Sequence, residues 1–124
     1  MQPLLILDTS MLFAPFNYSF NFDIAVQDFL GPVEIVVPSS VIKELEGLAK
    51  TNNLARTVLR FAAKYKVVEV SQRGDRGIIE CAEKFTGREI FVATLDTKLG
   101  ERIRKKGYKV VFLREGQKLA LRER

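Results

Sequence analysis

The sequence predicts an α/β fold, in which a central parallel sheet of about five strands is covered by helices on both faces. Short apolar runs without alternation are typical of strands buried on both sides. Patterns of helical periodicity separate these runs, as expected when parallel strands are joined by crossover helices. No repeat, linker or low-complexity segment interrupts the 124 residues, so we expect a single domain over residues 1–124.

Five segments have the character of buried strands, and these are LLILDT from Leu4, then 33–38, 66–70, 89–96 and 108–113. Five segments have helical patterns, and these are 22–31, 39–50, 53–65, 76–85 and 97–106. Gly31-Pro32 is a typical helix stop, and Ser39 and Ser40 are suited to capping the second helix. Helices are therefore predicted in the segments between the strands.

Two segments fall outside this alternation. Residues 13–22, FAPFNYSFNF, are predicted to form an ordered, packed loop or a short helical turn. Their aromatic side chains favour a place in the core or at a subunit interface over a platform for stacked bases. Residues 115–124 are predicted to be a C-terminal tail or a short helix packed on the domain, with an arm on RNA or a partner contact as the alternatives.

The composition excludes several classes of protein. Histidine is absent, which removes the imidazole base of serine and cysteine hydrolases and the zinc sites that need His. The single cysteine, Cys81, allows no internal disulfide and favours a reducing cytoplasm. No apolar run approaches the roughly 20 residues of a membrane span, so no membrane segment or signal peptide is expected.

The net charge of +5 is carried by the C-terminal half of the chain. A basic half predicts a polyanionic partner, and a solvated basic face without a partner is an equal alternative on charge alone.

Acidic side chains follow three of the predicted strands. Asp8 and Asp96 stand where buried strands end, and Asp75 follows the strand that ends near Val70. Each alone could be a helix N-cap, which contributes about 1 kcal/mol. Ligands of open α/β sheets bind at the carboxyl ends of the strands, however. Three carboxylates at that edge would repel one another unless a cation lay between them.

Glu44 adds a fourth carboxylate. It lies one turn into the helix 39–50, where Ser40 as cap would place Lys43, not Glu44, at the capping-box position. The alternative is an ordinary surface residue of the helix. Together with the three aspartates, Glu44 predicts a cluster of oxygen ligands without His or thiolate, which selects Mg²⁺ or Mn²⁺ over zinc or copper.

Four segments carry a resemblance to a known family. LLILDTS, VVPSSVIKELEGL, GDRGIIECA and VATLDTKLGERIRKKG occur in the order and context of a PIN domain. The chain resembles the small archaeal and ribosomal-RNA-processing PIN nucleases and, more distantly, toxins of the VapC type. From Leu4 to about Leu113, the resemblance implies a Rossmann-like sheet and a metal-dependent endoribonuclease that leaves a 3′-hydroxyl and a 5′-phosphate.

The family's acidic positions match Asp8, Glu44, Asp75 and Asp96, and Ile78 completes an Asp-x-x-Ile element. We expect Asp8 and Asp96 to be the principal ligands of one or two ions and Asp75 to complete the site. Glu44 would hold a water or help to deprotonate it. The hydroxyl residues expected to support these ligands by hydrogen bonds are Thr9, Ser10 and Thr94.

The chain departs from the family at three positions. Ser10 stands where many relatives have Asn, Lys98 stands where several have an acidic residue, and Arg76 follows Asp75 where an Asp pair is common. These changes make the site less negative and bear on whether a second ion binds. The basic residues expected to contact RNA are Arg73, Arg76, Lys98, Arg102, Lys105 and Lys106.

The function expected from these residues is RNA processing or decay in the cytoplasm. A PIN-fold module that binds RNA or protein with weak or no catalysis is one alternative, and a toxin of a toxin–antitoxin pair is another. The resemblance also implies a homodimer, and an antitoxin or a ribosome-assembly factor could be a partner. A phosphatase-type domain with Asp8 as nucleophile is disfavoured, because DTS lacks the second aspartate of the usual Asp-x-Asp motif.

Overall fold

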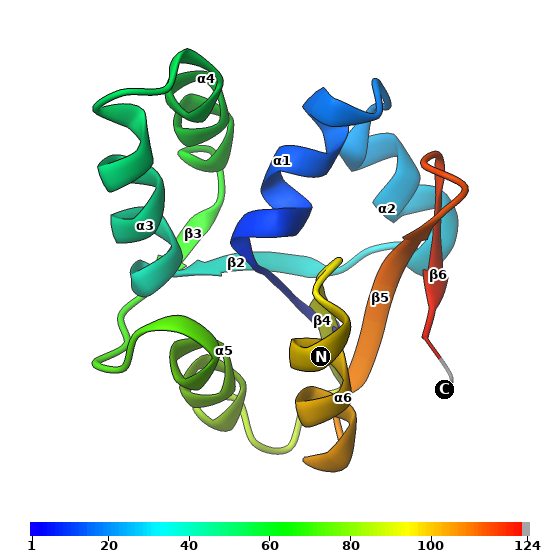
Figure 1. The fold of residues 1–124 in the computed structure, drawn as a ribbon. Coiled ribbons are helices and arrows are strands. Elements are labelled where there is room, and N and C mark those ends of the chain that lie inside the picture. Colours follow the sequence, from blue (N-terminus) through cyan, green and yellow to red (C-terminus); the bar gives the residue numbers. More distant parts are fainter. Residues whose placement is uncertain (123–124) are drawn as a thin grey trace.

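The computed structural model describes residues 1–122, which form a six-stranded sheet flanked by six helices (Figure 1). The strands are β1 (Leu4–Leu7), β2 (Glu34–Pro38), β3 (Lys66–Val68), β4 (Ile90–Ala93), β5 (Lys109–Arg114) and β6 (Lys118–Leu121). The helices are α1 (Thr9–Asn17), α2 (Phe22–Leu30), α3 (Ser39–Ala49), α4 (Asn53–Ala62), α5 (Gly74–Glu83) and α6 (Thr97–Lys105). The predicted α/β class is confirmed.

The strand order is β3-β2-β1-β4-β5-β6, and all pairs are parallel except β5 with β6. The chain builds the sheet outward from β1 to β3 and then returns to the other side of β1 to form β4. The sheet therefore reverses its direction of growth between β1 and β4, and a reversal of this kind opens a crevice at the carboxyl ends of those strands.

The C-terminal segment differs from the prediction. Lys118–Leu121 form a strand that pairs antiparallel with β5, with Arg114 opposite Lys118, and not a helix or a free tail. Leu119 is buried in this hairpin, whereas the adjacent Lys118, which points to the other face of the strand, is exposed. The last two residues of the predicted tail, 123 and 124, lie outside the described part of the chain.

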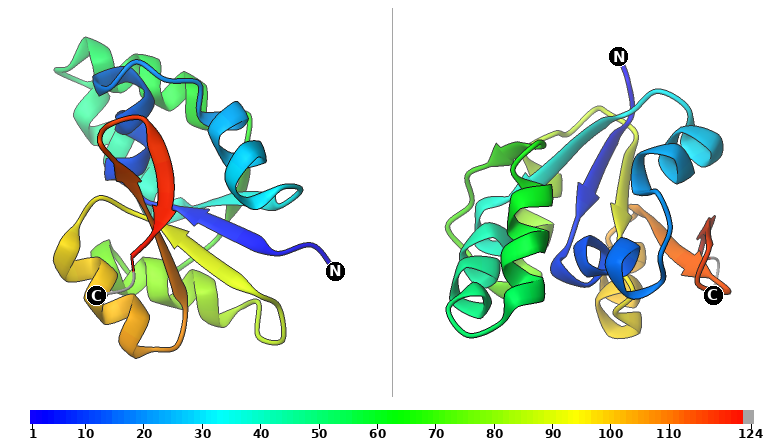
Figure 2. Two further views of the ribbon diagram at one scale, coloured as in Figure 1. Left: turned by 90° about the vertical axis from the view of Figure 1, so that its right-hand side faces the viewer. Right: turned by 90° about the horizontal axis from the view of Figure 1, so that it is seen from above.

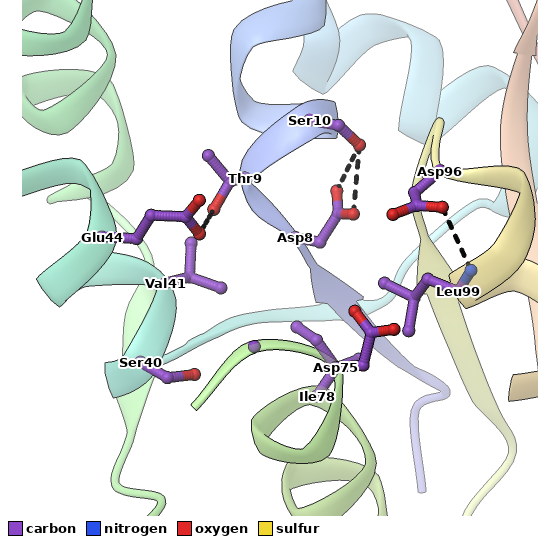
Figure 3. A pocket seen from close by; sticks show the side chains of 11 residues that line it. Asp8, Thr9, Ser10, Ser40, Val41, Glu44, Asp75, Ile78, Asp96 and Leu99 are labelled. Carbon is purple, nitrogen blue, oxygen red and sulfur yellow. Dashed lines mark hydrogen bonds between the residues drawn. The ribbon is translucent and has the colours of Figure 1, made fainter. Parts of the chain in front are cut away.

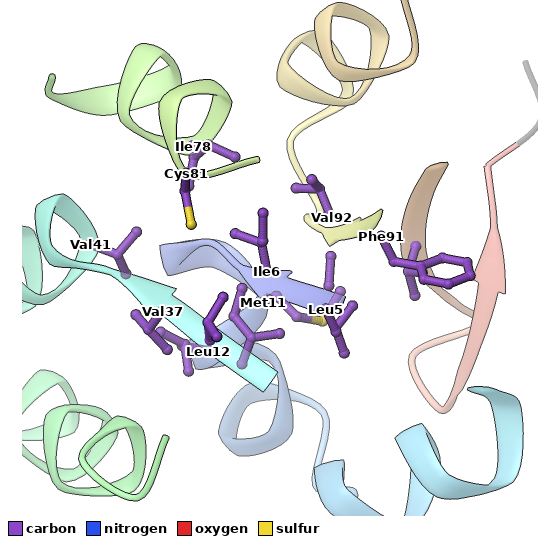
Figure 4. Packing of buried hydrophobic residues seen from close by; sticks show 14 of the residues in the cluster. Leu5, Ile6, Met11, Leu12, Val37, Val41, Ile78, Cys81, Phe91 and Val92 are labelled. Atoms are coloured by element: carbon purple, nitrogen blue, oxygen red, sulfur yellow. The ribbon is translucent and has the colours of Figure 1, made fainter. Parts of the chain in front are cut away.

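Burial on both faces explains why the strands do not alternate. All four residues of β1 are fully buried. Ile6 points toward Ile78 and Cys81 of α5, whereas Leu5 lies toward the opposite face with Met11 of α1 (Figure 4). A strand covered on both sides needs an apolar residue at every position.

The helices form two layers around the sheet. α1, α2 and α4 lie above it and α5 and α6 below it, and α3 packs against α4 beside the end of β2 (Figures 1 and 2). None of the helices within residues 1–122 is long and apolar enough to cross a membrane.

The aromatic segment 13–22 is more regular than predicted. Asp8 caps α1, which continues through Pro15 to Asn17, so half of this segment is helical. Phe22 is buried as expected of a core residue, whereas Phe16 and Tyr18 are exposed. Phe16 lies edge-on to Phe61 of α4 with ring centroids 5.5 Å apart. Phe22 lies edge-on to the same ring at 6.2 Å.

An ion pair beside this cluster predicts a pH dependence. Lys64 and the Tyr65 hydroxyl both donate hydrogen bonds to the carboxylate of Asp23. Burial of Asp23, the largest single effect, acts to raise its pKa, but the two donors together hold the pKa below its usual value of 3.8. The ionised form is thus favoured in the folded protein. Its stabilisation is present above pH 3.8 and is lost as the pH falls below that value.

We therefore expect Asp23→Asn to lower the free energy of unfolding by less than about 1 kcal/mol at pH 7, because the pair is half exposed. At pH 3 the difference from the wild type should shrink. Urea unfolding at both pH values measures this, and an equal difference at pH 3 and pH 7 would contradict it.

Candidate active site

A pocket of about 350 Å³ opens where β1 and β4 end, and all four predicted carboxylates line it. Asp8, Asp75 and Asp96 point into the same space, and Glu44 faces it from α3 (Figure 3). The remaining lining residues are Thr9, Ser10, Ser40, Val41, Gly74, Ile78 and Leu99. The fold thus brings together acidic residues that are separated by up to 88 positions in the sequence.

Asp8 is the most enclosed of the four carboxylates. Only 6% of its surface is exposed. Its Oδ1 atom accepts hydrogen bonds from the Met11 amide at 2.9 Å and from the Ser10 hydroxyl at 2.8 Å. Its Oδ2 atom accepts one from the Thr94 hydroxyl. Asp8 therefore caps α1, the alternative role that was predicted for it. The same hydrogen bonds hold its carboxylate in one orientation at the pocket.

Burial raises the pKa of Asp8 from 3.8 to about 6. The hydrogen bonds from Thr94, the Met11 amide and Ser10 act in the opposite direction, and the nearby Asp96 raises the pKa further. Within residues 1–122, no Lys or Arg pairs with this carboxylate. Asp8 is thus a buried charge without a protein counter-ion, which is costly unless a cation binds.

Asp96 is the exposed counterpart of Asp8. It caps α6, since its Oδ1 atom accepts from the amides of Lys98 at 3.0 Å and Leu99 at 3.2 Å. Its own amide donates to the Thr94 hydroxyl at 3.0 Å. Because Thr94 donates in turn to Asp8, one threonine connects the two aspartates. The Ser10 hydroxyl, which donates to Asp8, also accepts a hydrogen bond from the Leu95 amide at 2.9 Å.

Glu44 is held by a hydroxyl group as well. Thr9 donates to its Oε1 atom at 2.6 Å, and this bond joins the first turn of α1 to α3. Pro38, not Ser40, is the N-cap of α3, so the predicted cap was wrong by two residues. With Pro38 as the cap, the third helical position is Val41. Glu44 is therefore not part of a capping box, as predicted.

Asp75 differs from the other aspartates because it caps no helix. It lies in the first turn of α5, whose N-cap is Arg73. Its Oδ2 atom is paired with Arg102 of α6 at 3.0 Å. Arg102, predicted to contact RNA, thus has a carboxylate partner at the rim of the pocket.

The other predicted basic residues lie in different places. Arg76, Arg102 and Lys106 line a neighbouring hollow of about 440 Å³. Arg73 lines an adjoining pocket of about 620 Å³, together with Lys43, which was not predicted. Lys98 and Lys105 are exposed on α6, and neither lines the carboxylate pocket. Four of the six predicted basic residues therefore line two other hollows of the surface, and none of the six lines the carboxylate pocket itself.

The donor set fits a hard divalent cation. All the acidic side chains at the pocket offer oxygen atoms, which Mg²⁺ and Mn²⁺ prefer. The buried charge of Asp8 would gain most from such an ion. Within the described chain, no group of three Asp, Glu or Cys side chains is drawn together tightly enough to hold an ion by itself. Waters or substrate oxygens would therefore complete the coordination, as is common for Mg²⁺.

The chain is similar to one known protein family and to solved protein structures. A family model described as a PIN like domain matches residues 5–116. The solved structure of the PIN domain endonuclease Utp24 superposes with a TM-score of 0.80 at 22% identity, covering 95% of this chain and 90% of that one. A domain of a functionally unknown protein from Methanocaldococcus jannaschii superposes with a TM-score of 0.65 at 18% identity, covering 100% of this chain and 96% of that one. No curated protein matches the sequence.

Proposed function

Because the chain belongs to the family of PIN-like domains, we propose that it is a metal-dependent endoribonuclease whose active site is the carboxylate pocket. The observation that carries this proposal is the position of Asp8. It is a buried carboxylate without a protein counter-ion, aimed into a pocket that three further carboxylates line. The fold places this pocket at the reversal point of the sheet, where α/β proteins bind their ligands.

Each side chain at the carboxylate pocket has its own role in phosphodiester hydrolysis. Asp8 and Asp96 are the principal ligands for the divalent ion, and Asp75 completes the set. Bound there, the ion supplies a more acidic water and positive charge beside the phosphoryl oxygens. Thr94 fixes Asp8 with its hydroxyl and positions Asp96 through that residue's amide, so both carboxylates keep a set spacing.

Glu44 acts on the attacking water. Thr9 occupies its Oε1 atom, which orients the carboxylate while it takes the proton of a nearby water. Arg102 neutralises Asp75 before substrate arrives. The planar fork of the Arg102 guanidinium would suit it to bind a phosphate of the substrate in place of that carboxylate.

RNA is the substrate that this proposal assigns, in line with the basic C-terminal half. The cleaved strand would carry a 3′-hydroxyl and a 5′-phosphate, and the role would be processing or decay of cytoplasmic RNA. A second candidate is a module that binds RNA without cutting it. The Asp75–Arg102 pair favours this candidate, because an internal cation already satisfies one of the expected ligands.

Glu44→Gln provides the sharpest test within the site, because Glu46 on the same helix is a matched control. Both are exposed on α3, but only Glu44 lines the pocket. We expect the wild type to cut a single-stranded RNA with Mg²⁺ or Mn²⁺ and to stop when EDTA is added. Glu44→Gln should lower the rate by about 100-fold, the lower range for a lost general base, and Glu46→Gln should not change it.

Two outcomes would contradict the proposal. Cleavage that persists in excess EDTA would remove the metal from the reaction. A wild type that binds RNA but never cuts it under any of these conditions would favour the binding module.

A further inference from the structure

A second pocket adjoins the carboxylate pocket and has no role in the function proposed above. Its volume is about 620 Å³, larger than the 350 Å³ of the first. Ser40, Glu44 and Gly74 line both pockets, so the two lie side by side. The second pocket lies between the start of α3 and the loop that leads from β3 into α5.

Two helices begin at this pocket, and their N-termini are unlike the others. The side chains of Asp8, Asn21, Asn52 and Asp96 cap α1, α2, α4 and α6. Within the described chain, no side chain caps α3 or α5. The first amides of both helices are therefore available to an acceptor from outside, and the partial positive charge of each helix start favours an anion.

The side chains at the pocket also favour an anion. Lys43 and Arg73 line it, and neither is paired with a carboxylate anywhere in residues 1–122. By contrast, Arg102 at the first pocket is paired with Asp75. Two unpaired cations in one concave site are a favourable arrangement for phosphate, which Lys binds as a point charge and Arg binds through its fork.

Ser40 supplies an independent indication of a missing ligand. Its hydroxyl oxygen is buried and has no hydrogen-bond partner among the described residues. Ser40 is partly exposed and lines both pockets, and its Oγ atom lies so close to α5 that a Cβ atom at Gly77 would come within 2.5 Å of it. A buried hydroxyl left unpaired costs free energy, and a bound acceptor removes that cost.

We infer that the second pocket is a phosphate subsite, which holds a phosphodiester next to the one being cleaved on the same single strand of RNA. This inference rests on the proposed nuclease function, because it takes the first pocket as the place of cleavage. Lys43 and Arg73 bind the non-bridging oxygens of the neighbouring phosphate, and the starts of α3 and α5 face it. The subsite orients the strand, so that its next phosphate lies among the four carboxylates.

Binding measured without cleavage tests the subsite independently of the nuclease. In EDTA, the affinity for a fluorescent single-stranded RNA is measured by anisotropy between 50 and 200 mM salt. The double variant Lys43→Gln/Arg73→Gln is compared with Lys50→Gln/Arg60→Gln, which removes the same charge from exposed positions at the C-cap of α3 and on α4 that line neither pocket. Each lost phosphate contact lowers the log–log salt slope by about 0.7.

Because both cations bind the same phosphate, we expect the salt slope of the pocket variant to fall by about 0.7, which makes the affinity loss between 50 and 200 mM salt about 3-fold smaller. The slope of the control variant should remain that of the wild type. Equal changes in both double variants would overturn the inference, because they would indicate general attraction between the protein and RNA. No change in either would overturn it as well.

A chemically modified RNA locates the contact. One phosphodiester at a time is replaced by an uncharged methylphosphonate along a short strand. A single position should weaken wild-type binding, and the same replacement should cost the pocket variant nothing, because its cations are already absent. If the wild type cuts RNA, that position should lie beside the cleaved bond. A binding loss that the pocket variant retains would place the contact elsewhere. Absence of cleavage with this binding pattern intact would refute the nuclease but not the subsite.

Discussion

Asp8→Asn is expected to abolish cleavage and at the same time to stabilise the fold. The loss of activity should exceed about 100-fold, because a direct ligand matters more than the outer partners whose loss costs 10- to 100-fold. The gain in stability follows from burial. Asp8 is 6% exposed, its pKa is raised to about 6, and no cationic side chain in the described chain is paired with it.

The sign of the stability effect can be derived from this pKa. The unfolded chain ionises Asp8 near pH 3.8, whereas the folded chain retains the proton until about pH 6. The fold therefore gains from the protonated acid below pH 3.8, and this gain is lost as the pH rises through 6. At pH 8 the charged carboxylate opposes folding. The pKa shift corresponds to about 3 kcal/mol. Asparagine carries no charge at this pH and keeps an oxygen for the Met11 amide but loses the acceptor of the Thr94 hydroxyl, so we expect a net gain of about 2 kcal/mol.

Asp96→Asn is the matched comparison for this experiment. It should lose activity as well, but Asp96 is exposed, and its replacement removes no buried charge. Thermal unfolding at pH 8 with EDTA present measures both variants without a contribution from bound metal. Equal stability of the two variants would show that burial of Asp8 carries no cost. An active Asp8→Asn protein would mean that cleavage does not depend on the carboxylate pocket.

Gly77→Ala is expected to destabilise the protein and to disturb the site, although it adds only one methyl group. The new Cβ would lie 2.5 Å from the Ser40 Oγ atom and 2.6 Å from the Gln72 carbonyl oxygen. The second of these belongs to the backbone and cannot rotate away, so the start of α5 has to move. Overpacking of this kind typically costs about 1–3 kcal/mol. Asp75 lies two residues before Gly77, and a shift of about 1 Å at a reacting group can cost about 100-fold in rate.

Gly47→Ala in α3 separates this contact from the general effect of removing a glycine from a helix. No atom lies within 4 Å of a Cβ at Gly47. Alanine is favoured over glycine inside a helix by about 1 kcal/mol, so Gly47→Ala should raise the urea midpoint while Gly77→Ala lowers it. Removing the Ser40 hydroxyl in the double variant Ser40→Ala/Gly77→Ala should restore part of the loss. Equal midpoints for the two alanine variants would contradict the predicted contact.

The order of the elements could be predicted because it depends on local patterns. A strand such as β1 is apolar at every position because both of its faces are covered, and this can be recognised in four consecutive residues. The placement of Asp8 and Asp96 at strand ends followed from the same runs. Their capping of α1 and α6 was foreseen as an alternative, and it coexists with their place at the pocket.

The errors concern residues whose state depends on distant partners. Phe16 was expected in a packed loop or a short helical turn, but it lies in the nine-residue helix α1 and packs on Phe61 of α4. Residues 118–121 were expected in a tail or helix, but pairing with β5 makes them a strand. A short segment has no intrinsic preference strong enough to decide between strand and helix, so the neighbour that it meets decides.

By itself, the sequence determined the fold class, the strands that end in carboxylates and the oxygen chemistry of the site. All of these depend on residue type and on spacing over a few positions. Only the tertiary structure decided that Thr94 connects Asp8 with Asp96, that Arg102 pairs with Asp75, and that two uncapped helices meet beside Lys43 and Arg73. These contacts join residues far apart in the chain, and their geometry exists only once the sheet has brought its strand ends to one edge.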